Sequence, residues 1–508
     1  MMEQLPLWES TPDHRASIKP LSKSRVAAGL QCLKRVYLET YAYDDRDPID
    51  PGRQAILDAG REVGVVARGR YPGGVTVMED AKHHDDAVRR TAAVLPDPST
   101  PAIYEAAFTH DGIRVRVDVL TRAEGREWDL VEVKSSTGFK EEYIPDLAAQ
   151  VYVVEGSGIR VRRAFLLHVN NQYVWPGGAY DLDALFSTQD LTGDARSSIP
   201  ALLTKVQTMR EVLRGIAPPE VAVGPHCRKP YPCPYYSRCH GDGPEHRVTD
   251  LPRLSPKIYR ALLGAEIEDI RDIPEDFDGL SALQRRVRDC VVSGMPFTHP
   301  SLKSKLEEVR YPVHFLDFET CNPALPIIPG TRPFQQTPFQ FSNHVLEPSG
   351  SARHIEFLHA QRTDPRPRLA EELLRALGDD GSIVVYSEFE ERVIRSLAEA
   401  LPSLAPRLLR LLENRIVDLH QLIHEHYYHP GFHGSFSIKD VLPVLVDGLD
   451  YRDLSIREGS QAALAFSQMT APSTAPAERE RLRTALLAYC ERDTVAMLRM
   501  FQTLKETS

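Results

Sequence analysis

The spacing of apolar residues in the first half of the chain predicts strands and helices in succession. Three successive strands are expected at residues 103–108, 113–120 and 128–136, and apolar and polar residues alternate along 113–120. A helix over residues 146–156 and a strand over 162–169 are expected next. Helical spacing predicts three further helices: one from Ser22 onward, one over 56–70 and one over 199–215. The order strand, strand, strand, helix, strand is typical of an α/β fold.

The second half begins with a short apolar run, HFLDF at residues 314–318, which predicts a strand. The strands expected after it are at 339–345, 355–358, 382–386 and 415–419. The expected helices are at 368–377, 390–401 and 485–504. Residues 246–300 form a separate helical region, in which 262–274 resembles a helix-turn-helix hairpin; a plain α-helical linker domain is an equally good interpretation. A patch rich in Ser, Thr, Ala and Pro over 469–477 predicts a loop.

The length of 508 residues exceeds what one hydrophobic core supports, so several domains are expected. We place them at residues 17–245, 246–305 and 306–508, after a polar, poorly ordered lead-in over 1–16. The chain start lacks the basic-then-apolar pattern of a signal peptide, and the run of about 18 apolar residues that a membrane span needs does not occur. A cytoplasmic protein without a membrane partner is therefore expected.

The net charge of -10 does not by itself indicate a nucleic-acid-binding protein. Net charge is a weak guide, however, because a metal site adds carboxylates and binding needs only a local basic face. The 7 cysteines of a cytosolic chain favour metal or cluster ligation over a disulfide framework.

Two carboxylates stand close together in the run HFLDFET. Asp317 and Glu319 are two residues apart, so in a strand both side chains point to the same face. Adjacent carboxylate oxygens suit a hard cation such as Mg²⁺ or Mn²⁺. The pair alone is also compatible with an ordinary acidic strand end, so the rest of the chain has to decide.

The C-terminal segment YCERD supplies further groups of the same kind. Tyr489 and Asp493 are four residues apart and therefore lie on one helix face. Glu390, at the start of an expected helix, adds a fourth carboxylate, and Asp418 is the alternative for this position. Four carboxylates can bind two metal ions about 4 Å apart, with Tyr489 orienting the attacking water.

A second set of ionisable residues lies on the expected strands of the first half. Glu132 and Lys134 are two residues apart on one strand, and Asp118 ends the strand before it. If the two strands pair as a hairpin, Asp118 comes beside Glu132, and the two carboxylates can hold a metal that activates water. Lys134 would offset phosphate charge, and Gln150 on the next helix would hydrogen-bond near the site. Glu105 is a further candidate ligand.

Three cysteines follow the first half with the spacing C-x5-C-x5-C: Cys227, Cys233 and Cys239. Such a group of thiolates in a cytosolic chain predicts a metal or cluster site that needs a fourth ligand. The other cysteines outside the first helix are isolated and are interpreted as incidental thiols: Cys290, Cys321 and Cys490.

The D…ExK pattern with its trailing Gln resembles the RecB-like PD-(D/E)xK nucleases, including the CRISPR-associated RecB-like exonucleases, over roughly residues 22–243. This resemblance implies a restriction-endonuclease-like fold that hydrolyses DNA with Mg²⁺ or Mn²⁺. It also implies a [4Fe–4S] cluster held by Cys32 and the three later cysteines, with zinc as the rival for four thiolates. The sequence departs from this family at two places. The early helix GREVGVVAR has no His ligand, so Glu62 or Glu105 would have to substitute for it. Val154 occupies a position that is usually Tyr.

The motifs DFET and YCERDT resemble those of the DEDD (DnaQ-type) exonucleases of the RNase H-like superfamily, in the subtype marked by Tyr489. The resemblance implies an RNase H-like α/β domain with 3′-5′ exonuclease activity. The middle motif departs, because Glu390 stands where such enzymes usually have Asp. Both domains together are similar to a bacterial family of uncharacterised function that fuses the two nuclease types. Its SIK stretch fits too, with Lys439 either contacting phosphate or simply solvated.

These resemblances imply a metal-dependent nuclease with two nuclease domains joined by a small helical region that is helix-hairpin-helix-like. Its expected substrate is nucleic acid, DNA in preference to RNA, in repair, recombination or mobile-element defence. In one alternative, the first domain binds nucleic acid without cutting and only the DEDD domain trims RNA or DNA ends, which the missing His favours. In another, both sites are degenerate and the protein is a scaffold.

Overall fold

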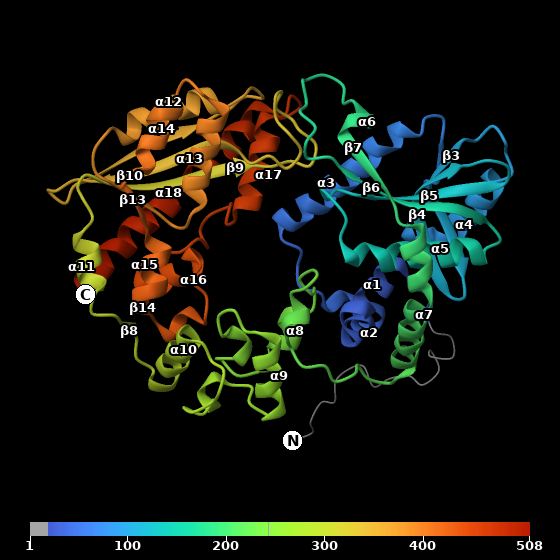
Figure 1. The fold of residues 1–508 in the computed structure, drawn as a ribbon, viewed down its shortest axis with the longest axis horizontal. Coiled ribbons are helices and arrows are strands. Elements are labelled where there is room, and N and C mark those ends of the chain that lie inside the picture. Colours follow the sequence, from blue (N-terminus) through green and yellow to red (C-terminus); the bar gives the residue numbers. More distant parts are fainter. Residues whose placement is uncertain (1–18, 242, 508) are drawn as a thin grey trace. The chain divides into compact units, whose positions relative to one another are not determined.

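The computed structural model describes residues 19–241 and 243–507. The lead-in expected over residues 1–16, including the chain start without a signal pattern, lies outside the described residues. The chain divides into two compact units (Figure 1). The described part of the first unit comprises residues 19–49, 57–173 and 179–241, and that of the second comprises 50–56, 174–178 and 243–507. Each unit combines a mixed sheet with helices, so the expected α/β class is confirmed.

The first unit contains a seven-stranded sheet with the order β2-β3-β4-β5-β6-β7, in which β1 pairs with the start of β4. The strands are β1 (Leu21–Ser22), β2 (Val75–Thr76), β3 (Ala102–His110), β4 (Ile113–Arg122), β5 (Glu127–Lys134), β6 (Arg160–Val169) and β7 (Phe186–Asp190). β3, β4 and β5 are antiparallel, whereas β5 and β6 run parallel because α5 (Ile144–Gly156) crosses back between them. The predicted order strand, strand, strand, helix, strand is confirmed.

The helices of the first unit include a break that the sequence pattern did not predict. They are α1 (Lys23–Gln31), α2 (Leu33–Tyr41), α4 (His84–Val94), α6 (Leu182–Leu185), α7 (Thr192–Arg214) and α8 (Tyr236–His240), while α3 (Pro51–Ala67) is shared by both units. The helical pattern from Ser22 is interrupted at Cys32, whose backbone is extended (φ -161°, ψ 127°) between α1 and α2. α5 is mostly apolar and packs in the core against β3, β4 and β6.

The second unit contains a five-stranded sheet with the order β11-β10-β9-β12-β13. Its strands, close to the predicted ranges, are β9 (Val313–Cys321), β10 (Thr337–Leu346), β11 (Ala352–Leu358), β12 (Ser382–Val385) and β13 (Ile416–Asp418). β9, β10 and β11 are antiparallel, and β12 and β13 continue the sheet parallel to β9. Every residue of β10 is buried, because helices cover both faces of this sheet.

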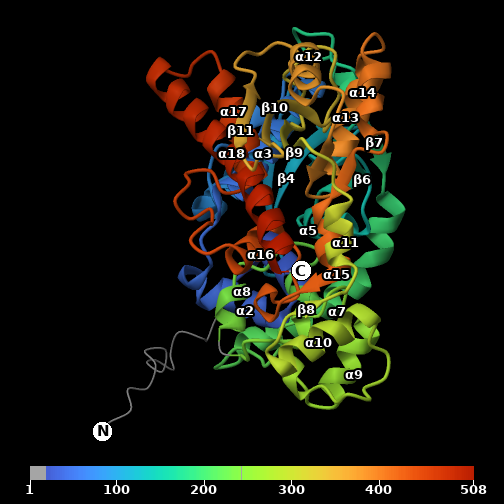
Figure 2. The same cartoon turned by 90° about the vertical axis from the view of Figure 1, so that its left-hand side faces the viewer.

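The two faces of this sheet carry different helices (Figure 2). α17 (Gly459–Thr470) and α18 (Pro476–Thr507) cover one face, where Phe339 stacks on Phe466 with ring centroids 4.0 Å apart. α12 (Arg366–Leu377), α13 (Phe389–Ala400) and α14 (Ala405–Leu412) cover the other, where Phe318 and Phe341 are buried. Because side chains alternate along a strand, neighbouring residues of β9 point to opposite faces of the sheet.

The remaining elements of the second unit surround one end of the sheet. They are α9 (Pro256–Gly264), α10 (Ala282–Ser293), β8 (Phe297–Thr298), α11 (Leu302–Glu307), α15 (Leu419–His426), β14 (Tyr427–Tyr428) and α16 (Ile438–Leu445). Residues 262–274 do not form the predicted helix-turn-helix hairpin, because α9 ends at Gly264 and only a 3-10 turn, Ile270–Asp272, follows. Leu262 and Val287 belong to the same buried cluster as Phe315 of β9. The loop predicted over 469–477 is short, since α17 reaches residue 470 and α18 begins at 476.

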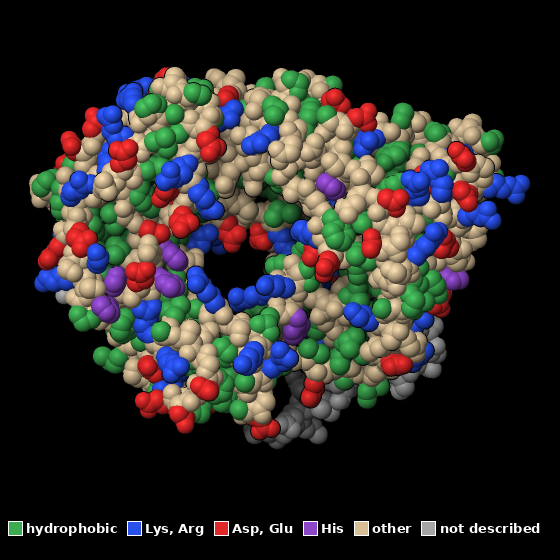
Figure 3. Space-filling model, in the orientation of Figure 1, with side chains coloured by type: hydrophobic (Ala, Val, Ile, Leu, Met, Phe, Trp, Pro, Cys, Tyr) green, Lys and Arg blue, Asp and Glu red, His purple; other side chains and the backbone are tan. Residues whose placement is uncertain are grey.

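Acidic and basic side chains are intermingled on the visible face of each unit (Figure 3). The net charge of -10 is therefore not concentrated in one acidic region of that face. Within residues 19–241 and 243–507, no helix has both the length and the apolar character that crossing a bilayer requires.

Candidate active sites

Asp317 and Glu319 line a cleft of about 460 Å³ beside β9. Both carboxylates point to the face that carries α18, because residues two apart in a strand share a face. α18 directs Tyr489 and Asp493 into the same cleft, since residues four apart lie on one helix face. Lys439, in the first turn of α16, lines it as well. The cleft thus collects side chains from β9, α16 and α18, and Phe389 of α13 and Ala463 of α17 line it as well.

Glu390 adds a fourth carboxylate from the first turn of α13. Its side chain is buried, and its Oε2 atom accepts no hydrogen bond from the described residues. Burial raises the pKa of Glu390 to about 8, and burial followed by repulsion from Asp493 raises the pKa of Asp317 and Glu319 well above their usual values. Buried oxygen donors that repel one another in this way fit a divalent cation, which would neutralise them.

The Asp493 carboxyl differs from the other three acids in the interactions that limit its pKa. Burial raises its pKa, but a hydrogen bond from the Tyr451 hydroxyl and the charges of Lys439 and Arg492 limit the value to about 6. Lys439 Nζ lies 5.8 Å and 5.9 Å from the ring centroids of Tyr451 and Tyr489. Sequence reasoning missed Tyr451, because nothing in its neighbourhood has the spacing of a motif.

Two residues differ from their interpretation in the sequence. Cys490 is not an isolated thiol, because its Sγ lies 3.4 Å from Asp317 Oδ2 and it shares a potential donor cluster with Asp317 and Glu319. Its position next to Tyr489 in YCERD was the available signal. Asp418, the alternative fourth acid, caps α15 by accepting the Gln421 N–H at 2.9 Å. Neither Asp418 nor Glu390 lines the cleft itself, but the charge of Glu390 acts on Asp317 and Glu319.

We expect a divalent cation to stabilise the second unit more at pH 8 than at pH 5.5. Folding raises the pKa values of the four carboxyls, so their protonated forms stabilise the folded state. This stabilisation is fully present below about pH 4 and is lost as the pH rises toward 8. Mn²⁺ at 100 times its dissociation constant adds about 2.7 kcal/mol, or about 5 °C in melting temperature. Thermal unfolding with and without Mn²⁺ at both pH values measures this; equal shifts at the two pH values would contradict it.

In the first unit, Asp118 of β4 and Glu132 of β5 come together. β4 and β5 are antiparallel, and Val119 pairs with Val131. In this register Asp118 lies opposite Glu132. The Asp118 carboxylate accepts the Val133 N–H at 2.7 Å. Burial and the neighbouring Glu132 charge raise the pKa of Asp118 to about 7. The hairpin geometry on which this site depends is therefore present.

Three donors surround the Glu132 carboxylate. Lys23 Nζ lies 2.8 Å and 3.0 Å from its two oxygens, Lys134 Nζ lies 2.9 Å from Oε1, and Gln150 Nε2 lies 2.7 Å from Oε2. Lys134 also contacts Asp146 of α5 at 2.8 Å. Burial opposes ionisation of Glu132, but the two lysines lower its pKa to about 2. Likewise, Glu132 and Asp146 raise the pKa of Lys134 against the effect of burial. Both groups are therefore charged at neutral pH.

Lys23 is the residue of this site that sequence reasoning missed. It is the first residue of α1, more than a hundred positions before Glu132, and no motif connects the two. Glu105, considered as a substitute ligand, is paired with Arg68 at 3.0 Å and Arg116 at 3.4 Å. Glu62, the other substitute, is exposed on α3.

Four cysteines line one small cavity: Cys32, Cys227, Cys233 and Cys239. The extended backbone at residue 32 places the first of them in the break between α1 and α2. Gln31 Nε2 donates to the carbonyl oxygens of His226 (2.7 Å) and Tyr231 (2.8 Å), so the end of α1 is fastened to the later cysteine loop. The loop itself is tightened by a 2.8 Å bond from the Cys233 N–H to the Cys227 carbonyl.

The thiols of this cavity differ in acidity. Burial raises the pKa of Cys233 and Cys239. Burial acts in the same direction on Cys32, but a hydrogen bond with His226 and nearby backbone N–H groups hold its pKa below the usual value. Four thiols around one small space are a donor set that suits a [4Fe–4S] cluster or zinc.

Comparison with known proteins matches only part of the chain. Residues 314–437 match the profile of a protein family described as "Domain of unknown function (DUF2779)". Curated protein sequences gave no match. The chain is similar to a solved structure titled "Crystal structure of SSO0001", at 11% identity over 45% of this chain and 89% of that chain, with a TM-score of 0.23. It is also similar to "Structure of the family B DNA polymerase from the hyperthermophilic archaeon Pyrobaculum calidifontis", at 16% identity over 39% of this chain and 27% of that chain, with a TM-score of 0.25. Both TM-scores are too low for either likeness to indicate a shared fold or function.

Proposed function

We propose that the second unit is a metal-dependent nuclease domain of the RNase H-like DEDD type that removes nucleotides from 3′ ends. The observation that carries the proposal is a set of four acids at one cleft: Asp317, Glu319 and Asp493 line it, and the charge of the buried Glu390 acts on the first two. The unpartnered Oε2 of Glu390 supports it, because a buried carboxylate oxygen is costly unless a ligand occupies it. Hard oxygen donors favour Mg²⁺ or Mn²⁺ over softer metals.

The residues around this cleft have separate tasks in the proposed reaction. Bound metal ions would activate water and neutralise the charge that develops on the phosphate. Burial raises the pKa of Tyr489, so its hydroxyl stays protonated at neutral pH and can orient the attacking water. The Lys439 ammonium, at the cleft wall, would bind a substrate phosphate. Tyr451 fixes the orientation of Asp493 through its hydrogen bond.

We propose further that the first unit is a RecB-like PD-(D/E)xK nuclease acting on DNA. Asp118 and Glu132 would hold the metal, and Lys134 would stabilise the charge on the cleaved phosphate. Gln150 orients Glu132 through its 2.7 Å hydrogen bond, while its own Oε1 is buried without a partner among the described residues. In this assignment the four-cysteine cavity holds a [4Fe–4S] cluster that joins α1 and α2 to the later cysteine loop, and zinc is the rival occupant.

One observation favours the second candidate, in which the first unit binds nucleic acid without cutting it. Lys23 occupies both oxygens of Glu132, so a divalent cation would have to displace an ammonium group whose pKa the nearby carboxylates raise against the effect of burial. Burial strengthens such an ion pair, because few waters compete for it. In this candidate only the DEDD cleft trims DNA or RNA ends.

Lys134→Ala separates these two candidates. If the first unit cuts DNA, this substitution should lower Mn²⁺-dependent cleavage by that unit about 10²-fold or more, as loss of one charge-stabilising donor does. The assay uses the full chain carrying Asp317→Asn, which silences the second site, on end-labelled single-stranded DNA, duplex DNA and RNA. Lys140→Ala is the matched control, since Lys140 is an exposed lysine whose ion pair is with Glu142 at 3.7 Å and whose Nζ lies 5.9 Å from the Tyr143 ring centroid.

The outcomes of this assay are distinct. Cleavage that survives Asp317→Asn and is lost with Lys134→Ala supports two nucleases. Cleavage that Asp317→Asn abolishes, with no effect of Lys134→Ala in the otherwise unchanged chain, supports the binding candidate. No cleavage of any substrate with Mg²⁺ or Mn²⁺ contradicts both and favours a scaffold.

A further inference from the structure

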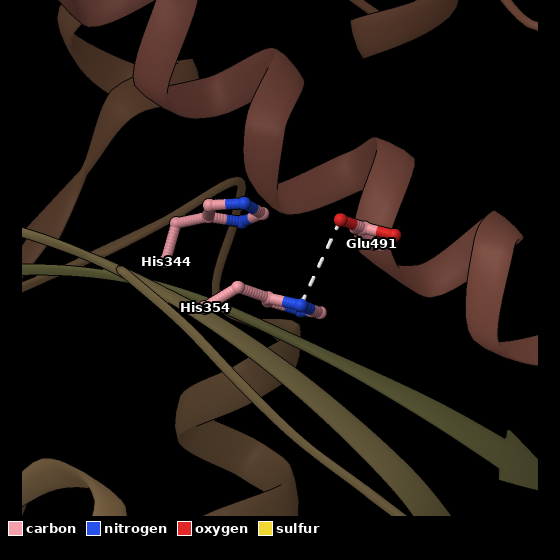
Figure 4. Close-up of side chains that lie close together, drawn as sticks. All are labelled: His344, His354 and Glu491. Carbon is pink, nitrogen blue, oxygen red and sulfur yellow. Dashed lines mark ion pairs between the residues drawn. The ribbon is translucent and has the colours of Figure 1, made fainter. Parts of the chain in front are cut away.

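Two histidines and a glutamate form a cluster of possible metal ligands that includes none of the cleft acids (Figure 4). His344 of β10 and His354 of β11 are direct cross-strand partners, and their rings stack with centroids 4.5 Å apart. Glu491 approaches them from α18, the helix that covers this face of the sheet. One donor atom of each residue lies within 4.8 Å of the donor atoms of the other two.

Two hydroxyl groups hold the imidazole rings in defined orientations. Thr494 Oγ1 lies 2.8 Å from His344 Nδ1, and Ser342 Oγ lies 2.8 Å from His354 Nε2. The two hydroxyls also contact each other at 2.7 Å. Each ring therefore has one nitrogen occupied by a hydroxyl, which leaves His344 Nε2 and His354 Nδ1 as the nitrogens able to bind a ligand. Metal-binding histidines are typically oriented by such a partner on the other nitrogen.

The distances and charges suit a cation better than an ordinary ion pair. His354 Nδ1 lies 3.7 Å from Glu491 Oε1, longer than a hydrogen bond. Two ligands of a tetrahedral zinc ion, each about 2.0–2.1 Å from the metal, are about 3.3 Å apart, so only a small movement is needed. Burial, with help from His354 and Arg499, lowers the pKa of His344 to about 4, so its ring is neutral at pH 7. Neutral imidazoles are the form that binds metals.

We propose that His344, His354 and Glu491 bind a divalent transition-metal ion, with Zn²⁺ the best match to two imidazoles and one carboxylate. The ion enters from the solvent side, where the Glu491 side chain is half exposed. Water completes its coordination, since the chain supplies three ligands. Its effect is to fasten β11, at the edge of the sheet, to α18. This site is independent of the proposed nuclease activity, because none of its ligands is a carboxylate of the cleft.

Zinc content measured on the full chain tests the site. Protein stripped with a chelator is dialysed against limiting Zn²⁺, and bound zinc is counted by elemental analysis. Both His354→Gln and Glu491→Gln should bind one zinc fewer than the wild type at limiting Zn²⁺. Their affinity for that zinc should be at least about 100-fold lower, because loss of a hydrogen bond to a ligand, without loss of the ligand itself, causes a smaller decrease. Zinc should also raise the melting temperature of the wild type more than that of either variant.

Glu480→Gln is the matched control, because Glu480 is exposed on the same helix and the substitution removes the same charge. It should bind as much zinc as the wild type. Asp317→Asn should also retain this zinc, which separates the site from the carboxylate cleft; zinc held by the cysteines is equal in all variants and cancels. The proposal is overturned if both ligand variants keep the full zinc content, or if Asp317→Asn alone removes the same equivalent. Circular dichroism of Glu491→Gln verifies folding, and this exposed position tolerates the change.

Discussion

Asp317→Asn is expected to lower the Mn²⁺-dependent release of nucleotides from 3′ ends by about 10³-fold. The substitution keeps the size of the side chain but removes one of the four charges that would hold the metal ions. Metal-bound charge contributes several kcal/mol to such reactions, and about 4 kcal/mol corresponds to about 10³-fold in rate. Release of labelled mononucleotides from single-stranded DNA under single-turnover conditions measures the change.

The loss of activity should not come from unfolding. Asp317 is half-buried, and desolvation together with the charges of neighbouring acids raises its pKa, so the neutral amide removes a repulsion and metal-free Asp317→Asn should melt no lower than the wild type at pH 8. Asp379→Asn is the control, because Asp379 is an exposed residue of the same unit outside the cleft. An Asp317→Asn protein that retains activity within about tenfold of the wild type would refute the role of the cleft.

Cys227→Ser should have the largest effect on stability. If the four-cysteine cavity holds a metal group, its binding energy is folding energy, and structural zinc sites contribute about 10–16 kcal/mol in small domains. Even a fraction of that exceeds the roughly 1 kcal/mol of a typical substitution. We expect loss of iron or zinc from the purified protein and loss of the first unit's cooperative unfolding transition. For a [4Fe–4S] cluster, the brown colour and visible absorbance of the wild type should disappear as well.

Cys290→Ser provides the comparison, because Cys290 is also a buried thiol but lies in the second unit, outside the cysteine cavity. It should leave metal content unchanged. A colourless wild type without iron, from which Cys227→Ser removes one equivalent of zinc, would show that the cavity holds zinc and not a cluster. A Cys227→Ser protein with the metal content of the wild type would show that the cavity is not the metal site.

In both candidate sites, pairs of residues that lie on the same strand or helix could be predicted from the sequence. Asp317 and Glu319 share a strand face, and Tyr489 and Asp493 share a helix face, because the repeat of each element is set by the backbone itself. The strand predicted from alternation over 113–120 corresponds to β4 (Ile113–Arg122) for the same reason. The helix break at Cys32 could not be predicted in this way, because the apolar spacing continues across the residue that separates α1 from α2.

The sequence by itself determined the α/β class, the strands that carry the acids and the grouping of three cysteines. Only the tertiary structure decided which distant residues complete each site: Lys23 at Glu132, Tyr451 at Asp493, and Glu491 at the histidine pair. It also placed the Glu390 carboxyl where its charge acts on Asp317, whereas Asp418 caps α15. The physical reason is that spacing within an element depends on local backbone geometry, whereas contacts between elements depend on how sheet and helices pack, which no short stretch of sequence encodes.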